Sequence, residues 1–417
     1  MLKPSPFDRL LASPTLLCSF RPLFLAVLAS ALLGVALWLG FLGHGLPLPA
    51  VAGGPLVWHG HELLFGFGLA AVAGFVLTAV PEFTATKAFG RRVGLFFLLL
   101  WLAARLSFWL SGALGPWPAA LCNVALALAL PAFLGRRLLG DPLRRQWGFF
   151  GGLVALALVS VGFHFDVLRG DYPMRWLHAG VGVMMVLIVV ALSRISMRIL
   201  NDAIEARRAA GHEVDDDYRA RPPRRNLATF CIALFTLAEW IGLPGPLNGW
   251  LALAAAAALF NLLNDWHIGR ALFQRWALML YSIYWLMALG YLAIGVALLS
   301  GDFAVSAGRH LLTIGAMGVS VFAVLCIAGR THSGYALDER RWVPLATLLL
   351  VGAALLRGAS GWPDAPATVL IALAGIAWLA AFALASRYLA PIWLSSRPDG
   401  GVGCEEPLEA ASGGCRV

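Results

Sequence analysis

The most constraining feature of this sequence is a series of apolar runs, each about twenty residues long, that recurs along the chain. The first, residues 22–43, contains no charged side chain. A helix of roughly 20 apolar residues is long enough to cross the hydrocarbon core of a bilayer. Of the 417 residues, 60% are hydrophobic and 13% are charged, whereas soluble domains are about 25% charged. Most of the chain is therefore expected to lie in lipid.

Twelve apolar windows can be separated by charges or by proline and glycine. They are residues 22–43, 60–80, 93–111, 117–135, 147–166, 176–200, 227–243, 247–264, 276–299, 310–329, 342–360 and 366–387. This pattern predicts an all-α, polytopic membrane bundle of about 12 transmembrane helices. It argues against a soluble enzyme, a disordered scaffold and a nucleic-acid-binding module, so no nucleic acid is expected among the partners. The net charge of +9 is explained by basic cytoplasmic loops.

The charges also predict an orientation. Alternate loops are rich in arginine and lysine, beginning with Lys87, Arg91 and Arg92, and the loops between them contain few basic residues. The positive-inside rule then places the basic loops and both termini in the cytoplasm and requires an even number of spans. The predicted organisation is a cytoplasmic N-terminal segment (1–21), six helices (22–200), a cytoplasmic loop (201–226), six further helices (227–387) and a mobile cytoplasmic tail (388–417). The six cysteines form no CxxC pair and imply no disulfide framework.

Histidines gather at one level of this predicted topology. His61, His178 and His310 each begin an inward-running span, so all three lie at the outer membrane surface, and His59 and His164 lie at the same level. Imidazole is a common ligand of haem iron and copper, so histidines from separate helices could converge on one metal site. The alternative is that they only face lipid headgroups. Glycines near them, such as Gly182 and Gly315, could leave a slot for a flat macrocycle or serve helix packing.

Several charged side chains could serve such a site. Arg105 and Arg357 lie near the outer level, and Arg175 and Arg309 precede His178 and His310, so any of these could bind the propionates of a haem. Glu239 is the carboxylate placed well inside the seventh predicted span. It could relay protons, pair with an arginine or be protonated.

Three motifs carry a family resemblance. Trp58-His59-Gly60-His61-Glu62 opens the second span, and Gly329-Arg330-Thr331-His332-Ser333-Gly334 closes the tenth. With Phe20-Arg21-Pro22-Leu23-Phe24 at the first span, the sequence resembles the NnrS family of bacterial inner-membrane proteins, in order from the first span to the last.

The resemblance implies a twelve-helix protein of the bacterial inner membrane that contains haem b and copper. It implies binding or detoxification of nitric oxide and resistance to nitrosative stress, with an electron donor that is unknown. It raises five metal-ligand candidates: His59, His61, His178, His310 and His332. We expect His61, His310, His178, Arg175 and Arg309 to bind cofactor, with His61 and His310 as the first choice of haem pair. Ala288 stands where the family pattern has a histidine, which puts one ligand in doubt.

Two other functions compete with this one. The protein could be a nitric oxide reductase or an oxidase-like membrane enzyme, although the tenth span holds one histidine where haem–copper oxidases have two. It could also be a transporter without cofactors, although ionisable residues other than Glu239 lie at span ends rather than at the midplane. The absorbance spectrum separates these possibilities, because a transporter would show no haem band.

Overall fold

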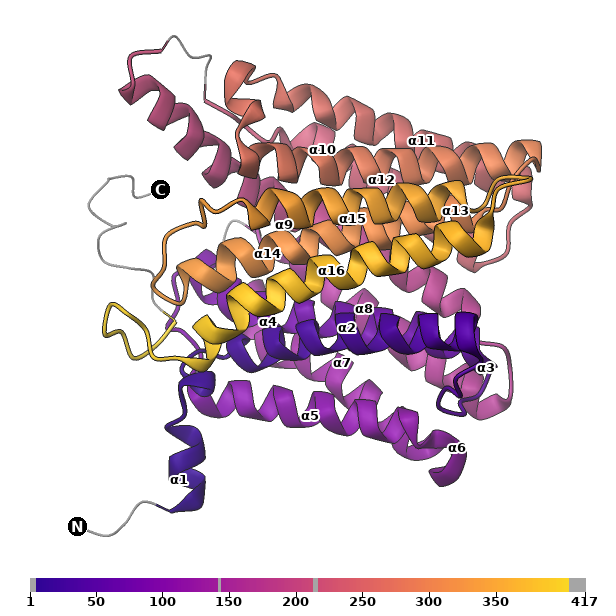
Figure 1. Cartoon of the computed structure of the whole chain (residues 1–417), viewed down its shortest axis with the longest axis horizontal. Coiled ribbons are helices and arrows are strands. Elements are labelled where there is room, and N and C mark those ends of the chain that lie inside the picture. Colours follow the sequence, from indigo (N-terminus) through magenta and orange to yellow (C-terminus); the bar gives the residue numbers. More distant parts are fainter. Residues whose placement is uncertain (1–4, 142–143, 213–216, 405–417) are drawn as a thin grey trace. The chain divides into compact units, whose positions relative to one another are not determined.

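The computed structural model describes residues 5–141, 144–212 and 217–404, and within these ranges the regular structure is entirely helical (Figure 1). Eleven helices in the described residues are long and apolar enough to cross a membrane, judged by length and composition. The expected all-α, polytopic membrane fold is therefore confirmed.

The chain forms two compact units. Unit 1 comprises Met1–Pro173, Val324–Val343 and Phe382–Val417, and unit 2 comprises Met174–Ala323 and Pro344–Ala381. The loop 201–226, which the sequence suggests as the divider between two halves, falls within unit 2.

Most of unit 1 comes from residues Met1–Pro173. Its elements are α1 (Pro6–Leu11), η1 (Pro14–Leu16), α2 (Phe20–His44), α3 (Gly54–His61), η2 (Glu62–Gly68), α4 (Leu69–Phe83), α5 (Arg91–Trp109), α6 (Ser111–Leu114), α7 (Pro116–Leu139) and α8 (Trp147–Arg169). Helix α2 packs against α4 and α5, and α7 packs against α5 and α8.

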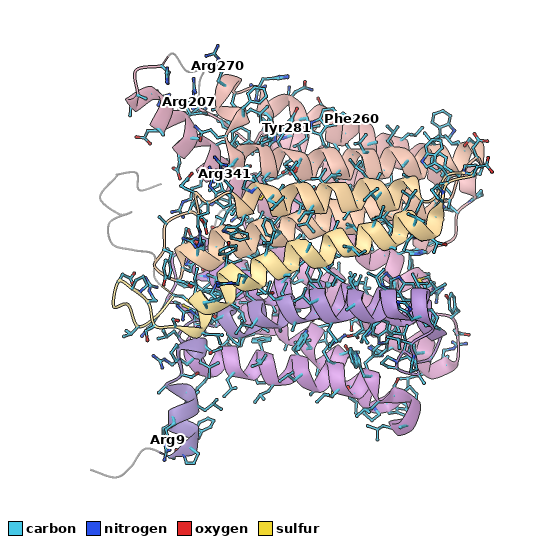
Figure 2. The ribbon with its side chains drawn as sticks, in the orientation of Figure 1. Arg9, Arg207, Phe260, Arg270, Tyr281 and Arg341 are labelled. Carbon is cyan, nitrogen blue, oxygen red and sulfur yellow. The ribbon has the colours of Figure 1, made fainter. Side chains whose placement is uncertain are left out.

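Unit 2 contains the middle of the chain. Its elements are α9 (Met174–Ala209), α10 (Pro222–Trp240), α11 (Gly245–Leu263), η3 (Asn264–Trp266), η4 (Gly269–Phe273), α12 (Arg275–Ser300), α13 (Ser306–His310) and η5 (Leu311–Met317). Helix α10 packs against α9 and α11, and α11 packs against α12. The side chains of Arg207 and Arg270 lie at the same end of this unit (Figure 2), as their predicted cytoplasmic loops require.

The last three helices contribute residues to both units. They are α14 (Gly318–Thr331), α15 (Trp342–Ala359) and α16 (Ala367–Leu394). The predicted tail begins at residue 388, but α16 continues to Leu394. Residues 405–417 of that tail lie outside the described ranges.

Two helices differ from the sequence prediction. Helix α9 continues to Ala209, nine residues beyond the predicted span, because Leu200, Ala203 and Ile204 bury an apolar face there. Helix α10 covers most of the predicted seventh span but is not among the eleven apolar helices. It carries Arg224 and Arg225 in its first turn, which lowers its hydropathy.

Two membrane-crossing helices contain a π-helical segment directly after a histidine. Segment η2 (Glu62–Gly68) follows His61, and segment η5 (Leu311–Met317) follows His310. Each is seven residues long, and each has glycine five positions after the histidine, Gly66 in one and Gly315 in the other. π-Helical turns interrupt α-helices rarely and frequently at functional sites. The structure thus singles out His61 and His310.

Candidate metal centre

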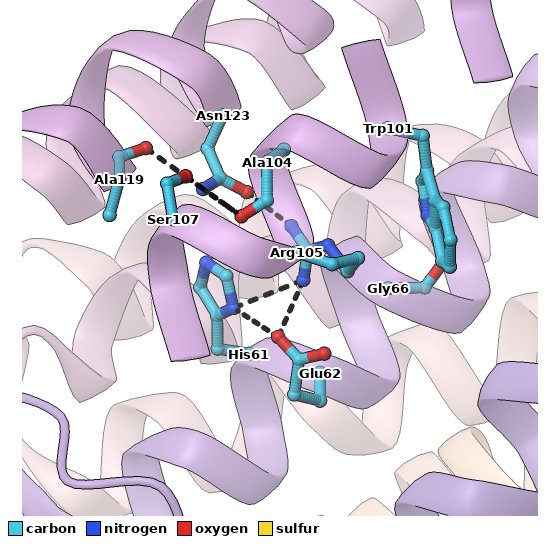
Figure 3. Close-up of polar contacts among 9 residues, drawn as sticks. All are labelled: His61, Glu62, Gly66, Trp101, Ala104, Arg105, Ser107, Ala119 and Asn123. Atoms are coloured by element: carbon cyan, nitrogen blue, oxygen red, sulfur yellow. Dashed lines mark hydrogen bonds and ion pairs between the residues drawn. The ribbon is translucent and has the colours of Figure 1, made fainter. Parts of the chain in front are cut away.

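His61 is completely buried in unit 1, at the last residue of α3. Its Nδ1 lies 3.1 Å from Oε1 of Glu62. Nη1 of Arg105 donates to the same carboxylate oxygen at 2.6 Å and lies 3.4 Å from the His61 nitrogen (Figure 3). An ionised carboxylate only accepts, so the hydrogen bond between His61 and Glu62 requires the proton on Nδ1. His61 then donates through Nδ1 and carries its lone pair on Nε2.

Arg105 completes a buried polar network around this histidine. Its other terminal nitrogen, Nη2, donates to Oδ1 of Asn123 on α7, and Nδ2 of Asn123 donates to main-chain oxygens of Ala119 at 2.8 Å and Ala104 at 3.2 Å. The side chains of Glu62 and Arg105 are 7% and 8% exposed. A charge pair buried this deeply is costly to form and more costly to break, so the network fixes the position of Glu62 firmly.

His164 of α8 lies beside His61. The two ring centres are 5.7 Å apart with an angle of 81° between the planes, and His164 is 1% exposed. Within the described part of the chain, Nε2 of His61 and both ring nitrogens of His164 are buried without a hydrogen-bond partner. Unsatisfied buried nitrogens are unfavourable, and a bound cation would satisfy Nε2 of His61 and the lone-pair nitrogen of His164.

The arrangement fits a small metal ion. Two imidazoles that bind one ion through nitrogens at about 2 Å have ring centres about 6 Å apart, close to the observed separation. A histidine that binds metal usually donates its other N–H to a carboxylate or carbonyl, as His61 does to Glu62. The described residues contain no group of three His, Cys, Asp or Glu side chains placed to hold an ion, so the pair would offer two protein ligands.

Aromatic rings surround the His61 imidazole. Phe108 stacks on the His61 ring with a centre-to-centre distance of 3.5 Å, and Phe163 and Phe65 lie at 4.9 and 5.1 Å. These apolar side chains exclude water and favour a soft ion over a hard one.

Unit 2 contains a second polar cluster. Nη1 of Arg309 lies 3.1 Å from one oxygen of Glu239, and Nη2 contacts the other, so the pair is bidentate. His178 lies within electrostatic reach of both residues. The hydroxyl of Tyr291, which interacts electrostatically with both, is buried without a hydrogen-bond partner in the described residues. Of the three roles considered for Glu239, pairing with an arginine is the one observed.

His310 precedes η5 in the same unit. Its Nδ1 lies 2.7 Å from the main-chain oxygen of Ser306, one turn earlier. A neutral ring that donates there carries its lone pair on Nε2, which is the usual arrangement of a metal-ligating histidine.

The remaining predicted ligands lie elsewhere. His59 stacks on Trp38 at 4.3 Å. His332 lies 3.6 Å from Glu82. Glu82 is near the C-terminal end of the span Gly54–Phe83, whereas His61 is near the N-terminal end of the same span. Since 21 helical residues span roughly 30 Å, His61 and His332 cannot hold the same ion. Arg175 is exposed beside the rings of Trp176 and Trp240.

The glycines near these histidines serve close helix packing. A Cβ on Gly182 would lie 2.0 Å from Oγ1 of Thr236, and one on Gly318 would lie 2.6 Å from the ring of Trp378. A Cβ on Gly315 would approach Leu286 and Ala354 to 3.1 and 3.2 Å. Of the two roles that the sequence allows for them, packing is the one observed at these positions.

Sequence reasoning placed His164 at the correct level but did not select it as a ligand. Glu62 was visible only as part of a motif. In the sequence, the signal that could have identified His164 and Glu62 was the position of both ionisable residues at the membrane level of His61. Whether His164 contacts His61 depends on tertiary packing, which determines the face of α8 that points toward His61.

Comparison with known proteins identifies the family. The profile described as "NnrS protein" matches residues 14–397, nearly the whole chain. No curated protein matches the sequence. Among solved structures, the fold is similar to that of a haem–copper terminal oxidase dimer determined by cryo-EM, with a TM-score of 0.62 and 13% sequence identity, covering 92% of this chain and 86% of that one. At this identity the likeness concerns the fold alone. Since the family profile covers both units, from the segment before α2 to the end of α16, the chain belongs to the NnrS family.

Proposed function

We propose that this protein is a copper- and haem-binding protein of the bacterial inner membrane that binds or detoxifies nitric oxide and thereby confers resistance to nitrosative stress. The observation that carries the proposal is the His61–His164 pair, two buried imidazoles with unsatisfied nitrogens at a separation suited to one ion. Membership of the NnrS family and an oxidase-like fold support the same reading.

Copper is proposed at His61 and His164. Two neutral imidazoles in an apolar enclosure suit Cu(I), which accepts few ligands. A bound copper ion would supply one-electron chemistry and a binding position for nitric oxide. Glu62 holds His61 in the tautomer that presents Nε2, Arg105 holds Glu62, and the phenylalanine rings exclude water. Nitric oxide is small and uncharged, so it can reach such a site through lipid.

Haem b is proposed in unit 2, with His310 as a ligand through Nε2. The hydrogen bond from Nδ1 to Ser306 orients the ring as a haem ligand requires. His178 is the second candidate ligand in that unit, and Arg175 is the candidate for a propionate. Arg309 already holds a carboxylate, that of Glu239. His61 and His310 belong to different units, so their pairing on one haem stays a prediction, as do the metal-binding roles of His59 and His332.

Cofactor content of the purified full-length protein tests these assignments. Copper by mass spectrometry and haem by extraction are measured in wild type, His61→Ala, His164→Ala and His310→Ala, with His44→Ala, an exposed histidine at the end of α2, as the control. We expect His61→Ala and His164→Ala to lose copper and keep haem, and His310→Ala to show the reverse. A copper content equal to that of the wild type in both His61→Ala and His164→Ala would refute the copper site.

The second candidate function is a membrane oxidoreductase acting on nitric oxide, which the fold likeness to a terminal oxidase favours. Anaerobic incubation of reduced protein with nitric oxide separates the two. Catalytic turnover requires consumption beyond one equivalent per metal centre, whereas binding alone stops at stoichiometry.

The topology completes the proposal. Counting α10 as a span gives twelve crossings and places both termini in the cytoplasm, as the alternation of basic loops requires. Reporter fusions after residues 45, 140 and 301 should report periplasm, cytoplasm and periplasm in that order.

A further inference from the structure

A buried serine shares a helix face with His164. Ser160 lies on α8, one helical turn before His164, and is 0% exposed. Residues four positions apart are neighbours on the surface of an α-helix, with about 6 Å between their Cβ atoms. Helical side chains also lean toward the N-terminus of the helix, so the His164 imidazole leans toward the turn that carries Ser160.

The hydroxyl of Ser160 has no hydrogen-bond partner among the described residues. A serine or threonine inside a helix commonly donates to the main-chain oxygen one turn earlier. Thr78, Ser196 and Thr236 do so in this protein, at 3.0, 2.6 and 2.7 Å. Ser160 departs from that pattern, so its O–H is available to a bound molecule.

Unpartnered polar atoms of three side chains therefore gather in one buried place. They are Nε2 of His61, both ring nitrogens of His164 and Oγ of Ser160, within the part of the chain that the structure describes. A soft ion such as Cu(I) prefers imidazole nitrogen to a hydroxyl oxygen. A copper ion would thus bind the two imidazoles and leave the serine hydroxyl for a second, smaller partner.

The surroundings determine which kind of molecule fits beside this hydroxyl. The ring centre of Phe163 is 4.9 Å from that of His61 and 6.1 Å from that of Phe65, and both phenylalanines are completely buried. A charged molecule would lose its hydration here without compensation. An uncharged diatomic molecule that accepts one hydrogen bond suits a single hydroxyl donor in an apolar enclosure.

We propose that Ser160 recognises nitric oxide at the His61–His164 site by donating a hydrogen bond from Oγ to the oxygen atom of that molecule. The inference rests on the proposed function, because it takes the two histidines as the copper site. Ser160 touches the bound molecule directly, whereas Glu62 acts through His61. A polar donor in this position favours a diatomic molecule with an acceptor oxygen over an apolar gas of similar size.

Infrared spectroscopy with carbon monoxide tests the proposal. Carbon monoxide is a diatomic probe with an acceptor oxygen, and Cu(I) binds it without consuming it. Full-length protein in detergent is loaded with copper, reduced without oxygen and exposed to the gas. The C–O stretching band and the dissociation constant are measured in wild type, Ser160→Ala and Ser160→Thr. Subtracting the spectrum of copper-free protein removes any haem band.

A hydrogen bond to the oxygen of carbon monoxide weakens the C–O bond and lowers its stretching frequency. Ser160→Ala should therefore raise the frequency and weaken binding about 2–10-fold, as expected for one hydrogen bond. Ser160→Thr keeps the hydroxyl and should resemble wild type. Heavy water should shift the wild-type band but not that of Ser160→Ala, because only the wild type donates an exchangeable hydrogen.

Ser320→Ala is the matched control. Ser320 lies on α14 within unit 2, is 6% exposed, and its hydroxyl also has no partner in the described residues. Its replacement should leave the band unchanged, because the proposed contact belongs to unit 1.

Copper content, measured on every sample by mass spectrometry, separates the outcomes. If wild type and Ser160→Ala hold equal copper and give the same band, the role of Ser160 is wrong and the copper site stands. If wild type binds no copper and shows no copper-dependent band, the copper site and this proposal fall together. Loss of copper from Ser160→Ala would show that the serine supports the metal or its ligands, and would also contradict the proposal.

Discussion

Arg105 of α5 and Glu62 of η2 form a buried ion pair, with 2.6 Å between Nη1 and Oε1. The same carboxylate oxygen lies 3.1 Å from Nδ1 of His61. One carboxylate thus neutralises a buried cation and orients a candidate metal ligand, so its removal should affect stability and metal binding separately.

Replacement of Glu62 by glutamine should destabilise the protein. The change leaves the Arg105 guanidinium buried without a counter-charge, which costs about 3–5 kcal/mol of unfolding free energy. Reversible unfolding in mixed detergent measures the loss. Glu82→Gln, at a side chain that is 44% exposed, should change little. Equal stability of the two variants would contradict the importance of the pair.

The same Glu62→Gln variant should also bind copper about 10–100-fold more weakly. Without the carboxylate, the His61 imidazole is a less basic ligand, and its orientation is held less firmly. Competition with a Cu(I) chelator of known affinity measures this. His61→Ala should lose binding altogether. Unchanged affinity in Glu62→Gln would separate the carboxylate from the metal site.

Glu239 and Arg309 should show strong coupling in a double-mutant cycle. Each side chain is 19% exposed, so Glu239→Gln should cost about 1–3 kcal/mol, as expected for the loss of charge-assisted hydrogen bonds. Arg309→Met in the Glu239→Gln background should add less than it costs alone. The exposed Asp302→Asn is the control. Strictly additive effects would show that the contact contributes nothing.

A methyl group at position 182 should push α9 away from α10. Gly182→Ala places Cβ 2.0 Å from Oγ1 of Thr236, and overpacking of this kind costs about 1–3 kcal/mol. Adding Thr236→Ala should restore part of the loss, since it removes the two nearest atoms. Gly352→Ala, where nothing lies within 4 Å, should be neutral or slightly stabilising. Thermal unfolding compares the four proteins.

Asp338 should contribute a pH-dependent part of the stability. Its side chain is 2% exposed, and the hydrogen bond from Arg340, with further help from Trp342 and the charge of Arg330, lowers its pKa below the ordinary value. A carboxyl whose pKa is depressed by folding stabilises the protein above its unfolded pKa of about 3.9 and loses that effect as the pH falls below it. The stability difference between wild type and Asp338→Asn should therefore be full near pH 7 and shrink below about pH 4. A difference independent of pH would contradict this.

The membrane fold was predictable because apolar length is a local property. The predicted span 22–43 corresponds to helix α2, Phe20–His44, and the predicted span 276–299 corresponds to helix α12, Arg275–Ser300. The candidate site was predictable only in part. His61 stands in a motif, whereas its contact with His164 depends on which face of α8 turns inward. Similarly, Glu239 and Arg309 are 70 residues apart, and no period in the sequence connects them.

The π-helical segments after His61 and His310 imply that each of these helices contains one inserted residue relative to a regular α-helix. Each residue turns an α-helix by about 100°. A deletion within 62–68 that restored regular winding would rotate the N-terminal part of the helix by that angle against the rest and swing the His61 imidazole away from α8. The extra residue therefore determines the direction in which the His61 side chain points. The extra residue after His310 does the same for the His310 side chain in unit 2.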